Sequence, residues 1–520
     1  MISRILLLLA TTTGLSFSAN WPNIVAIISE DMGPDLGCWG AKVHTPHIDS
    51  LATSGMRFTH CFGTASVCMP NRTAMITGMY QPSIGSVTMR PPAKFRVTLP
   101  EGIAPLPHLL RNHGYRTANI VDKKNIGSGG RDDWNFNFEG KSWDTKKLAD
   151  LTPDKPFYAQ FNFPMAHRPF RQDKEHPIDP ATVDLPPYYP DHPVARQAWS
   201  DYLESIQNLD RNVGKVLAWL EEKKLTENTI IFCYSDHGEA FLRGKYWLYD
   251  CSLNQHLIIH WPDKCQPPEG YQQGGTSSQL ISAVDIMAQT LVAADHPIPA
   301  KIHARPFLGD GVKPRSEIYS ASDWIGGSKI KSRSIRTARY KYIRNYNTDL
   351  SITSASTEYR KVEHPMFHLV NILAEQNKLS PLHRKLLHDK LPDEELYDLQ
   401  EDPHELQNLA DSPDHSDLKK QLRDKVEAYL KTSATKASSL FHPITSSISK
   451  LIKKTARKSG PSAETNSGRK SSIRSSKTNA PPLSHRHFSF PRHFERGKAP
   501  AQHPHSAWRQ YLPRLFQTMG

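Results

Sequence analysis

Three largely apolar runs constrain the fold more than any other feature of this 520-residue chain. They lie at 24–28, in the segment KPFYAQFNF at 155–163, and in TIIFCYS at 229–235. The first of them, 24–28, is continuous, which is typical of a strand that is buried on both faces. Segments with helical spacing of apolar residues separate them, as in 202–225. Strands that alternate with helices predict an α/β fold with a mostly parallel central sheet sandwiched by helices.

Polar residues follow two of these runs directly. Glu30 and Asp31 end the segment SED, and Asp236 and His237 lie in the segment SDHG. Folds of this class bind ligands beyond the carboxyl ends of their parallel strands. The sequence therefore predicts one site where these two segments meet, although about 200 residues separate them in the chain.

Changes in composition and in sequence pattern divide the chain into four predicted parts. Residues 1–19 have an early cation, a short apolar run and small residues, which together predict a secretory signal peptide and export to the periplasm or the medium. Residues 20–310 form the predicted catalytic domain, and 311–435 a smaller α+β subdomain with an amphipathic C-terminal helix. Residues 436–520 are rich in Ser, Pro, Lys, Arg and His and predict a disordered tail. No later stretch approaches the roughly 20 apolar residues that a membrane-spanning helix needs.

The formal charge of +13 belongs to this tail. From residue 436 onward there are 16 Lys and Arg against 2 acidic residues, which leaves 49 basic and 50 acidic residues in the first 435. The balanced charge of the globular part argues against a nucleic-acid-binding protein. The clustered cations of the tail are suited to contact a polyanion or the cell envelope.

A cysteine motif carries the strongest chemical signal. The segment SVCMPNRTAMITGMY at 66–80 contains Cys68, Pro70 and Arg72 in the pattern Cys-x-Pro-x-Arg. Five further segments stand around it in the order in which sulfatases have them: SEDMGPDLGCWG, TPHIDSLATSGMRF, HGYRTANIVDKKNIG, SDHGEAFLRGKYWLYD and LYDLQEDPHELQNL. The chain thus resembles the sulfatase family, with its alkaline phosphatase-like fold, over about 21–430. It looks most similar to an exported bacterial branch related to heparan N-sulfatases.

The resemblance implies a modified nucleophile at Cys68. In this family the modifying machinery reads Cys-x-Pro-x-Arg and oxidises the cysteine to formylglycine, an aldehyde. One hydroxyl of the hydrated aldehyde attacks the sulfate sulfur, and the other then expels sulfate by losing its proton, which is covalent catalysis in two easier steps. The implied substrate is a sulfate ester or an N-sulfate of a sulfated carbohydrate.

The resemblance also implies one divalent cation. Its implied ligands are Glu30, Asp31, Asp236 and His237, at the two predicted strand ends. The family usually has Asp at the position of Glu30, and Asn is also common at that of His237. Calcium is the family's usual ion, whereas the imidazole nitrogen of His237 suits Mn²⁺ or Zn²⁺ better. The sequence is compatible with all three ions.

The other implied site residues bind sulfate or move a proton. Arg72 lies one helical turn beyond the cysteine and holds the aldehyde hydrate. Lys123 and Lys245 match the family's sulfate-binding cations, and His167 matches the residue that protonates the leaving oxygen. Asn125 stands where the family often has a histidine, so it can hydrogen-bond the substrate but cannot shuttle a proton.

Two other functions fit parts of the pattern. An unmodified, degenerate sulfatase would bind sulfated glycans without turnover, and the departures from the family pattern at Glu30 and Asn125 leave this alternative open. A phosphate or phosphonate esterase of the same superfamily would commonly carry Ser or Thr as nucleophile and two metals. Structural roles compete as well, because a lone Cys68 is often a buried thiol and Asp236 could cap a helix.

Overall fold

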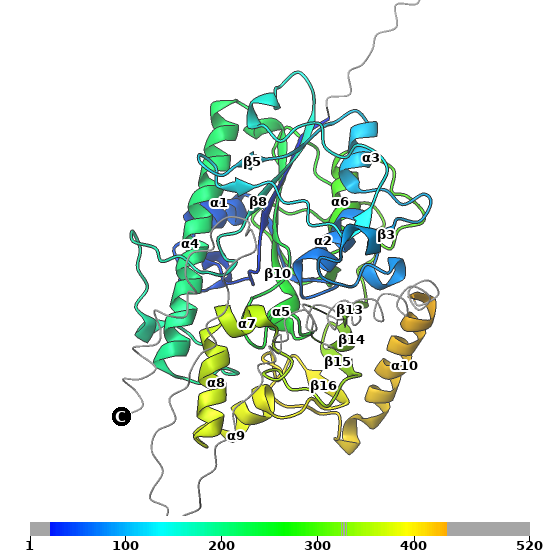
Figure 1. Cartoon of the computed structure of the whole chain (residues 1–520). Helices are drawn as coiled ribbons and strands as arrows, with labels where there is room; N and C mark the ends of the chain where they lie inside the picture. The colour runs from blue at the N-terminus through cyan, green and yellow to red at the C-terminus, as the bar shows by residue number, and fades with distance from the viewer. Residues whose placement is uncertain (1–20, 324, 326–327, 329, 434–520) are drawn as a thin grey trace, which may run out of the picture. The chain divides into compact units, whose positions relative to one another are not determined.

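The protein's structure, a computed structural model, describes residues 21–323, 325, 328 and 330–433 (Figure 1). The predicted signal peptide at 1–19 and the predicted tail at 436–520 lie outside the described residues. The main sheet has eight strands in the order β11-β2-β10-β9-β1-β8-β4, with β12 also paired to β2. Its strands are β1 (Asn23–Ser29), β2 (Met56–Phe62), β4 (Arg116–Asn119), β8 (Phe157–Phe163), β9 (Thr229–Ser235), β10 (Asn254–His260), β11 (Thr276–Ser277) and β12 (Ile281–Ser282).

Strand direction confirms the predicted mostly parallel sheet. β1 pairs in parallel with β8 and β9, and β8 pairs in parallel with β4. β10 is antiparallel to both of its neighbours, β9 and β2, while β2 runs parallel to β11 and β12. Every residue of β1, β8 and β9 is buried, which explains why their sequences are largely apolar.

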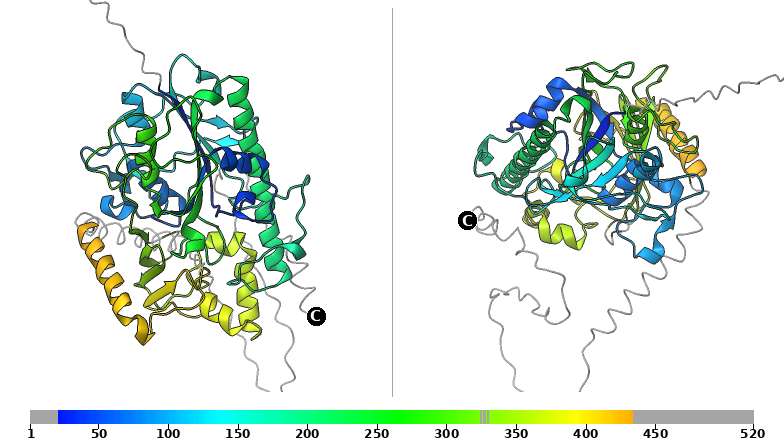
Figure 2. Two further views of the ribbon diagram at one scale, coloured as in Figure 1. Left: turned by 180° about the vertical axis from the view of Figure 1, so that it is seen from behind. Right: turned by 90° about the horizontal axis from the view of Figure 1, so that it is seen from above.

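Helices cover both faces of this sheet (Figures 1 and 2). Val25 and Ile27 of β1 share a core with α1 (Pro46–Ser54) and the long α4 (Pro193–Glu222). The alternate residues Ile24, Ala26 and Ile28 face the second core, to which three helices contribute: α2 (Cys68–Thr77), α3 (Leu106–Asn112) and α6 (Asp285–Ala293). Because successive side chains of a strand point to opposite faces of the sheet, β1 contributes to both apolar cores.

A second, antiparallel sheet follows, as the sequence predicts. Its strands β13 (Glu317–Asp323), β14 (Lys331–Thr337), β15 (Tyr340–Asn345) and β16 (Glu394–Asp398) pair in chain order. The helices of this region are α7 (Glu358–Glu363), α8 (Pro365–Glu375), α9 (Pro381–His383) and α10 (Ser416–Ser433). The predicted boundary near 310 falls between α6 and β13. None of the described helices combines the length and apolarity that crossing a membrane requires.

Contacts between the two sheets hold the loops of the main sheet. The Ala321 amide of β13 donates to the Thr64 carbonyl at 2.8 Å, and Ser320 Oγ donates to the Gly63 carbonyl at 2.7 Å. Both carbonyls belong to the loop between β2 and α2. The remaining elements of the main domain are short: α5 (Asp250–Leu253) and the two-residue strands β3 (Val97–Thr98), β5 (Val121–Asp122), β6 (Ser128–Gly129) and β7 (Phe136–Asn137).

Candidate active site

Three neighbouring strands end together at one edge of the sheet. The register aligns Ser29 of β1 with Ser235 of β9 and with Phe163 of β8. Asp31, Asp236 and His167 follow these strand ends within a few residues, and the Asp31 amide donates to Asp236 Oδ1 at 3.0 Å. The segments SED and SDHG are therefore adjacent, as the strand pattern indicates.

Cys68 is brought to the same edge by α2, because it is the first residue of that helix and Val67 before it is extended. The helix N-terminus favours negative charge on the group placed there. Asn71 fixes the approach of the loop: its Oδ1 accepts from the Thr64 amide at 2.8 Å, and its Nδ2 donates to the Asp236 carbonyl. Asn71 is thus a buried structural link between the cysteine motif and SDHG.

The thiol of Cys68 lies among charged groups. Its Sγ is 3.5 Å from Lys245 Nζ, 3.5 Å from His237 Nε2 and 3.6 Å from Asp31 Oδ1. Lys245 Nζ also donates to both carboxylate oxygens of Asp31 at 2.7 Å each. All four side chains are buried. This surrounding is that of a reactive centre, since an inert buried cysteine lies among apolar groups.

Asp31 adopts a backbone conformation that an L-residue rarely has, with φ at 57°. The left-handed region costs a non-glycine residue about 1 kcal/mol or more, and such residues cluster at active sites. The contacts of its carboxylate with Lys245 and with His237 Nε2, at 2.8 Å, hold it there. The strained backbone aims this carboxylate at the thiol.

The donor atoms at this edge suit a divalent cation. Ligand atoms of Asp31, Cys68, Asp236 and His237 all lie within 4.8 Å of one another. Two carboxylates and one imidazole are the mixed oxygen and nitrogen set that a divalent cation takes. Three of the four metal ligands implied by the sequence are therefore gathered and buried, and they fit the implied ion.

Glu30 is the exception, because its carboxylate faces two arginines. It contacts Arg131 directly and lies 3.7 Å from an Arg72 Nη2. Arg72 in turn donates from Nε to Asp236 Oδ2 at 2.9 Å and from Nη1 to Asn162 Oδ1 at 2.7 Å. Arg72, which lies in α2, thus positions the carboxylates of Glu30 and Asp236. The ligand role of Glu30 remains a prediction, and the gathered donor set does not include it.

Arg131 and Asn162 were missed by the sequence reasoning. Arg131 stands in GGRDDW, about 100 residues from Glu30, and only its charge beside two glycines marks it in the sequence. Asn162 lies inside a buried strand, where a polar residue in an apolar run is the available signal. Neither signal identifies a partner.

The Glu30–Arg131 pair is expected to show a measurable coupling. Each of the replacements Arg131→Met and Glu30→Gln is expected to lower the free energy of unfolding by about 2 kcal/mol, because each removes half of a largely buried ion pair. The double variant is expected to lose less than the sum, by about 1–3 kcal/mol. Urea unfolding of the four proteins measures this coupling.

Asp133→Asn is the matched control for this cycle, since Asp133 is the other carboxylate on Arg131, with a contact of 2.6 Å. It removes a partner of Arg131 without touching Glu30. Additive losses for Arg131 and Glu30, within about 0.5 kcal/mol, would show that the two side chains are not coupled.

Of the remaining predicted site residues, one lies in the cluster and two lie on an exposed turn. His167 is part of the cluster, with its Nε2 3.6 Å from Asp31 Oδ2 and its ring 5.9 Å from that of Tyr359 in α7. Lys123 and Asn125 are exposed in the turn between β5 and β6. The Asn125 side chain bonds its neighbour Asp122 at 3.2 Å. Their roles in sulfate binding remain predictions.

The loop that carries Lys245 is held by α7. Arg360 of this helix is buried and donates to the carbonyls of Leu242 and Lys245. Tyr359 lies beside Lys245, whose Nζ is 6.0 Å from the ring centroid. Sequence reasoning did not select either residue, because nothing in the local pattern links α7 to a loop more than 100 residues earlier.

Burial and mutual charge set the protonation of this cluster. Desolvation opposes the charged form of Asp31, but the charges of Lys245 and His167 outweigh it and hold the pKa of Asp31 well below its usual range. Desolvation likewise acts on His237, and Asp236 and Asp31 overcome it, which raises the pKa of His237 to about 10. The pKa of Lys245 is also raised well above its ordinary value, by Asp31 against desolvation. Mutual attraction between opposite charges therefore outweighs desolvation for Asp31, His237 and Lys245 in this cluster.

Glu239, two residues beyond His237, gives the fold a pH-dependent stability. Burial raises its pKa to about 8, with a smaller contribution from the Asp35 charge, and Tyr188 and Tyr189 donate to its Oε1. The folded state therefore keeps a proton that the unfolded state loses near pH 4.5. The free energy of unfolding is expected to fall between about pH 4.5 and pH 8, by a few kcal/mol from this residue.

Glu239→Gln is expected to remove this part of the pH dependence, because the amide is neutral throughout and can still accept from both tyrosines. Unfolding in urea at intervals from pH 4.5 to 9 measures the slope for both proteins. Asp35, whose pKa burial raises to about 6, should leave a smaller residual slope below pH 6 in the variant. An unchanged slope between pH 6 and 8 would refute the assignment.

Solved structures of known proteins have the same fold. A protein in complex with its substrate D-glucosamine-2-N,6-O-disulfate aligns with a TM-score of 0.57 at 18% identity, covering 80% of this chain and 99% of that one. A phosphonate monoester hydrolase from Silicibacter pomeroyi aligns with a TM-score of 0.56 at 16% identity, covering 80% and 96%. At these identities the likeness concerns the fold alone.

Sequence comparison is more specific. The family model described as Sulfatase matches residues 22–296. An ulvan-active sulfatase of Formosa agariphila is 32% identical over 464 residues, covering 79% of this chain and 74% of its own length. The human N-sulphoglucosamine sulphohydrolase is 23% identical over 461 residues, covering 78% and 89%. With the Cys-x-Pro-x-Arg cysteine placed among buried cations and carboxylates, the chain belongs to the sulfatase family, enzymes that hydrolyse sulfate esters.

Proposed function

We propose that this protein is exported and removes a sulfate group from a sulfated carbohydrate, with Cys68 converted to formylglycine as its nucleophile. The observation that carries the proposal is the place of Cys68 Sγ, at the start of α2 and 3.5 Å from both Lys245 Nζ and His237 Nε2. A sulfate group carries negative charge on its oxygens, which the Lys245 ammonium stabilises in a buried site. The conversion needs an external oxidant and the modifying machinery.

The chain's own residues have separable roles in the proposed reaction. An oxygen on residue 68 forms a bond to sulfur while the bond from sulfur to the sugar oxygen breaks. Lys245 stabilises the sulfate oxygens, and His167, half-buried at the rim of the cluster, donates a proton to the departing sugar oxygen. Lys123 and Asn125, on their exposed turn, are proposed to contact the sulfate or the sugar as it enters.

Asp31, Asp236 and His237 would hold the divalent cation, and Glu30 stands beside them. When bound, the cation supplies positive charge to the sulfate oxygens. Calcium is the ion proposed first, and Mn²⁺ and Zn²⁺ are the alternatives that His237 favours. Arg72 keeps Asp236 charged and oriented, since its Nε lies 2.9 Å from that carboxylate.

The substrate class follows from named relatives. Two are ulvan-active sulfatases, at 32% and 27% identity, and a third is a human N-sulphoglucosamine sulphohydrolase. Polysaccharide sulfates are therefore the first substrates to test, with O-sulfates ahead of N-sulfates because the more similar relatives act on ulvan.

The test combines a mass measurement with product analysis. Trypsin should release the peptide FTHCFGTASVCMPNR, residues 58–72, from protein secreted by a host with the modifying machinery. Formylglycine makes this peptide lighter by the exchange of sulfur for oxygen and the loss of two hydrogens. The same protein is expected to release sulfate from ulvan, measured by ion chromatography, with an N-sulfated glucosamine and a phosphate ester as comparison substrates.

Each outcome separates the proposed function from its rivals. An alkylatable thiol at position 68 in essentially all molecules, with tight ulvan binding and no sulfate release, would identify a glycan-binding protein. Faster release of phosphate than of sulfate would identify an esterase of the same fold. Recovery of the protein only from the cytoplasm would contradict export.

A further inference from the structure

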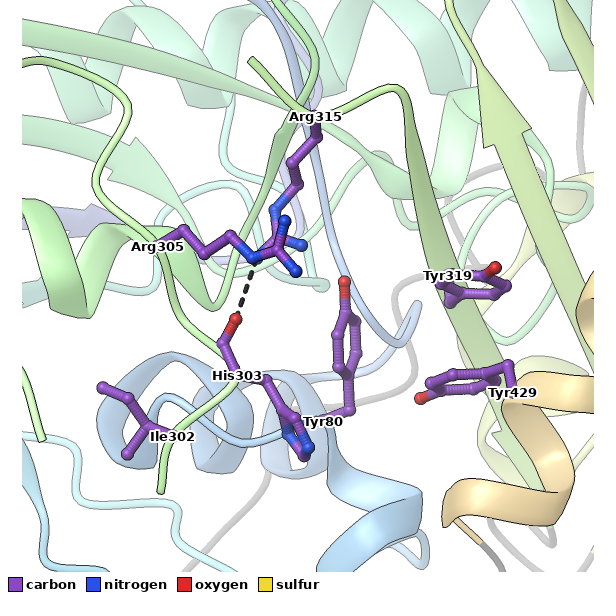
Figure 3. A pocket seen from close by; sticks show the side chains of 7 residues that line it. All are labelled: Tyr80, Ile302, His303, Arg305, Arg315, Tyr319 and Tyr429. Carbon is purple, nitrogen blue, oxygen red and sulfur yellow. Dashed lines mark hydrogen bonds between the residues drawn. The ribbon is translucent and has the colours of Figure 1, made fainter. Parts of the chain in front are cut away.

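A second pocket lies away from the cysteine, at the other end of α2 (Figure 3). Its volume is about 320 Å³, at the lower end of the range for small-molecule sites. The described residues that line it are Tyr80, Ile302, His303, Arg305, Arg315, Tyr319 and Tyr429. Because α2 begins at Cys68 and has 10 residues, about 15 Å of helix separates the two sites.

The walls of this pocket come from four parts of the chain that are tied together. The amides of His303 and Ala304 both donate to the Gly78 carbonyl, at 2.8 and 3.0 Å, and the Tyr80 amide donates to His303 Nδ1 at 3.2 Å. Opposite, Tyr319 of β13 stacks on Tyr429 of α10, with centroids 4.3 Å apart and an interplanar angle of 12°. Hydrogen bonds therefore fix one wall of the pocket, and ring stacking fixes the other.

The tyrosines give the pocket an aromatic lining with polar edges. The Tyr80 ring meets Tyr429 edge to face, with centroids 5.6 Å apart. Its hydroxyl points between Arg315 and Tyr319 in Figure 3 and is buried. Although it lies near Ser282 and the Tyr319 backbone, this hydroxyl makes no hydrogen bond of regular geometry with any of the described residues.

The charged side chains of the pocket determine whether an anionic or a cationic ligand is favoured. Arg315 is neutralised by Asp285, to which it donates from both Nε and Nη2, at 2.6 and 2.5 Å. The charge of Arg305 has no such compensation, since no described acidic side chain pairs with its exposed guanidinium. No carboxylate is among the described lining residues. An anionic group is therefore the favoured ligand of Arg305.

We propose that this pocket is a second, non-catalytic carbohydrate site that binds one anionic sugar unit, with its sulfate or carboxylate on Arg305 and its ring against the tyrosines. The choice of a carbohydrate rests on the proposed function. A sulfated polysaccharide repeats its anionic units, so the enzyme can hold one unit here while another occupies the catalytic centre. Such bivalent binding raises the apparent affinity for polymer without a change at the nucleophile.

The test measures binding by the full chain with Cys68→Ala, so that turnover plays no part. In affinity electrophoresis with ulvan in the gel, Arg305→Gln and Arg305→Glu are expected to weaken retardation about tenfold relative to the parent. Lys313→Gln and Lys313→Glu are the matched controls, because Lys313 is exposed eight residues away and does not line the pocket. Glucosamine 2-N,6-O-disulfate and glucuronate as competitors distinguish a sulfate from a carboxylate ligand.

A second readout uses the chain with Cys68 intact. Arg305→Gln should leave kcat and KM for a small aryl sulfate unchanged and raise KM for ulvan with little change in kcat. Equal retardation of the Arg305 and Lys313 variants would overturn the second site, and so would a loss of aryl sulfate turnover in Arg305→Gln. A parent protein without any sulfatase activity would refute the proposed function alone, because the binding comparison does not depend on turnover.

Discussion

Cys68→Ala is expected to reduce sulfate release by on the order of 10⁴-fold or more, because it removes the nucleophile that the motif and its surroundings serve. The thiol is buried, yet it is small, so the free energy of unfolding should change by only about 1 kcal/mol. Steady-state kinetics with an aryl sulfate and with ulvan measure the first effect, and urea unfolding the second. Loss of activity without loss of fold would separate a chemical role from a structural one.

Cys68→Ser is the matched comparison for the nucleophile. A serine oxygen can attack sulfur but lacks the second hydroxyl through which the hydrated aldehyde expels sulfate. The variant is therefore expected to accumulate a sulfated serine, visible as a mass increase of the 58–72 peptide after incubation with substrate. Activity of Cys68→Ala within tenfold of the parent would show that the nucleophile lies elsewhere.

Arg72→Met is expected to lower the free energy of unfolding by about 3–5 kcal/mol, the largest effect among the site variants. The guanidinium is 5% exposed and donates to Asp236 at 2.9 Å, while Glu30 lies 3.7 Å away. Methionine fills a similar volume but leaves both buried carboxylates short of a cation. Because Asp236 also belongs to the proposed metal set, the affinity for the divalent cation should change too. Urea unfolding measures the change in stability, and isothermal titration calorimetry measures the affinity for the divalent cation.

Arg90→Met provides the control for removing an arginine charge. Arg90 is 63% exposed and lies 3.7 Å from Asp133, so its loss should cost less than about 0.5 kcal/mol. Similar stability losses in the two variants would mean that the buried network around Arg72 is not energetically special. Arg72→Lys should recover part of the stability, since it restores the charge but not the geometry of two donors.

The buried strands were predictable because burial on both faces leaves a direct trace in the chain. β1, β8 and β9 appear as largely apolar runs, and the polar residues that follow β1 and β9 mark the site. The direction of β10 was not predictable, since its apolar residues Leu257, Ile258 and Ile259 are of the same type as those of the parallel strands β1 and β9. Hydrophobic pattern records which faces are buried, whereas strand direction depends on how the connections run.

The sequence by itself determined the mostly parallel sheet and the neighbourhood of Asp31 and Asp236, because these follow from local pattern and from the shared edge of parallel strands. The place of Cys68 beside them was implied by the order of the family's motifs. Only the tertiary structure decided which charged side chains meet within that neighbourhood. It turned Glu30 toward Arg131 and Arg72, and it brought Lys245 to Asp31 across 214 residues. Long side chains reach their partners through the packing of distant loops, and that packing leaves no periodic signal in the chain.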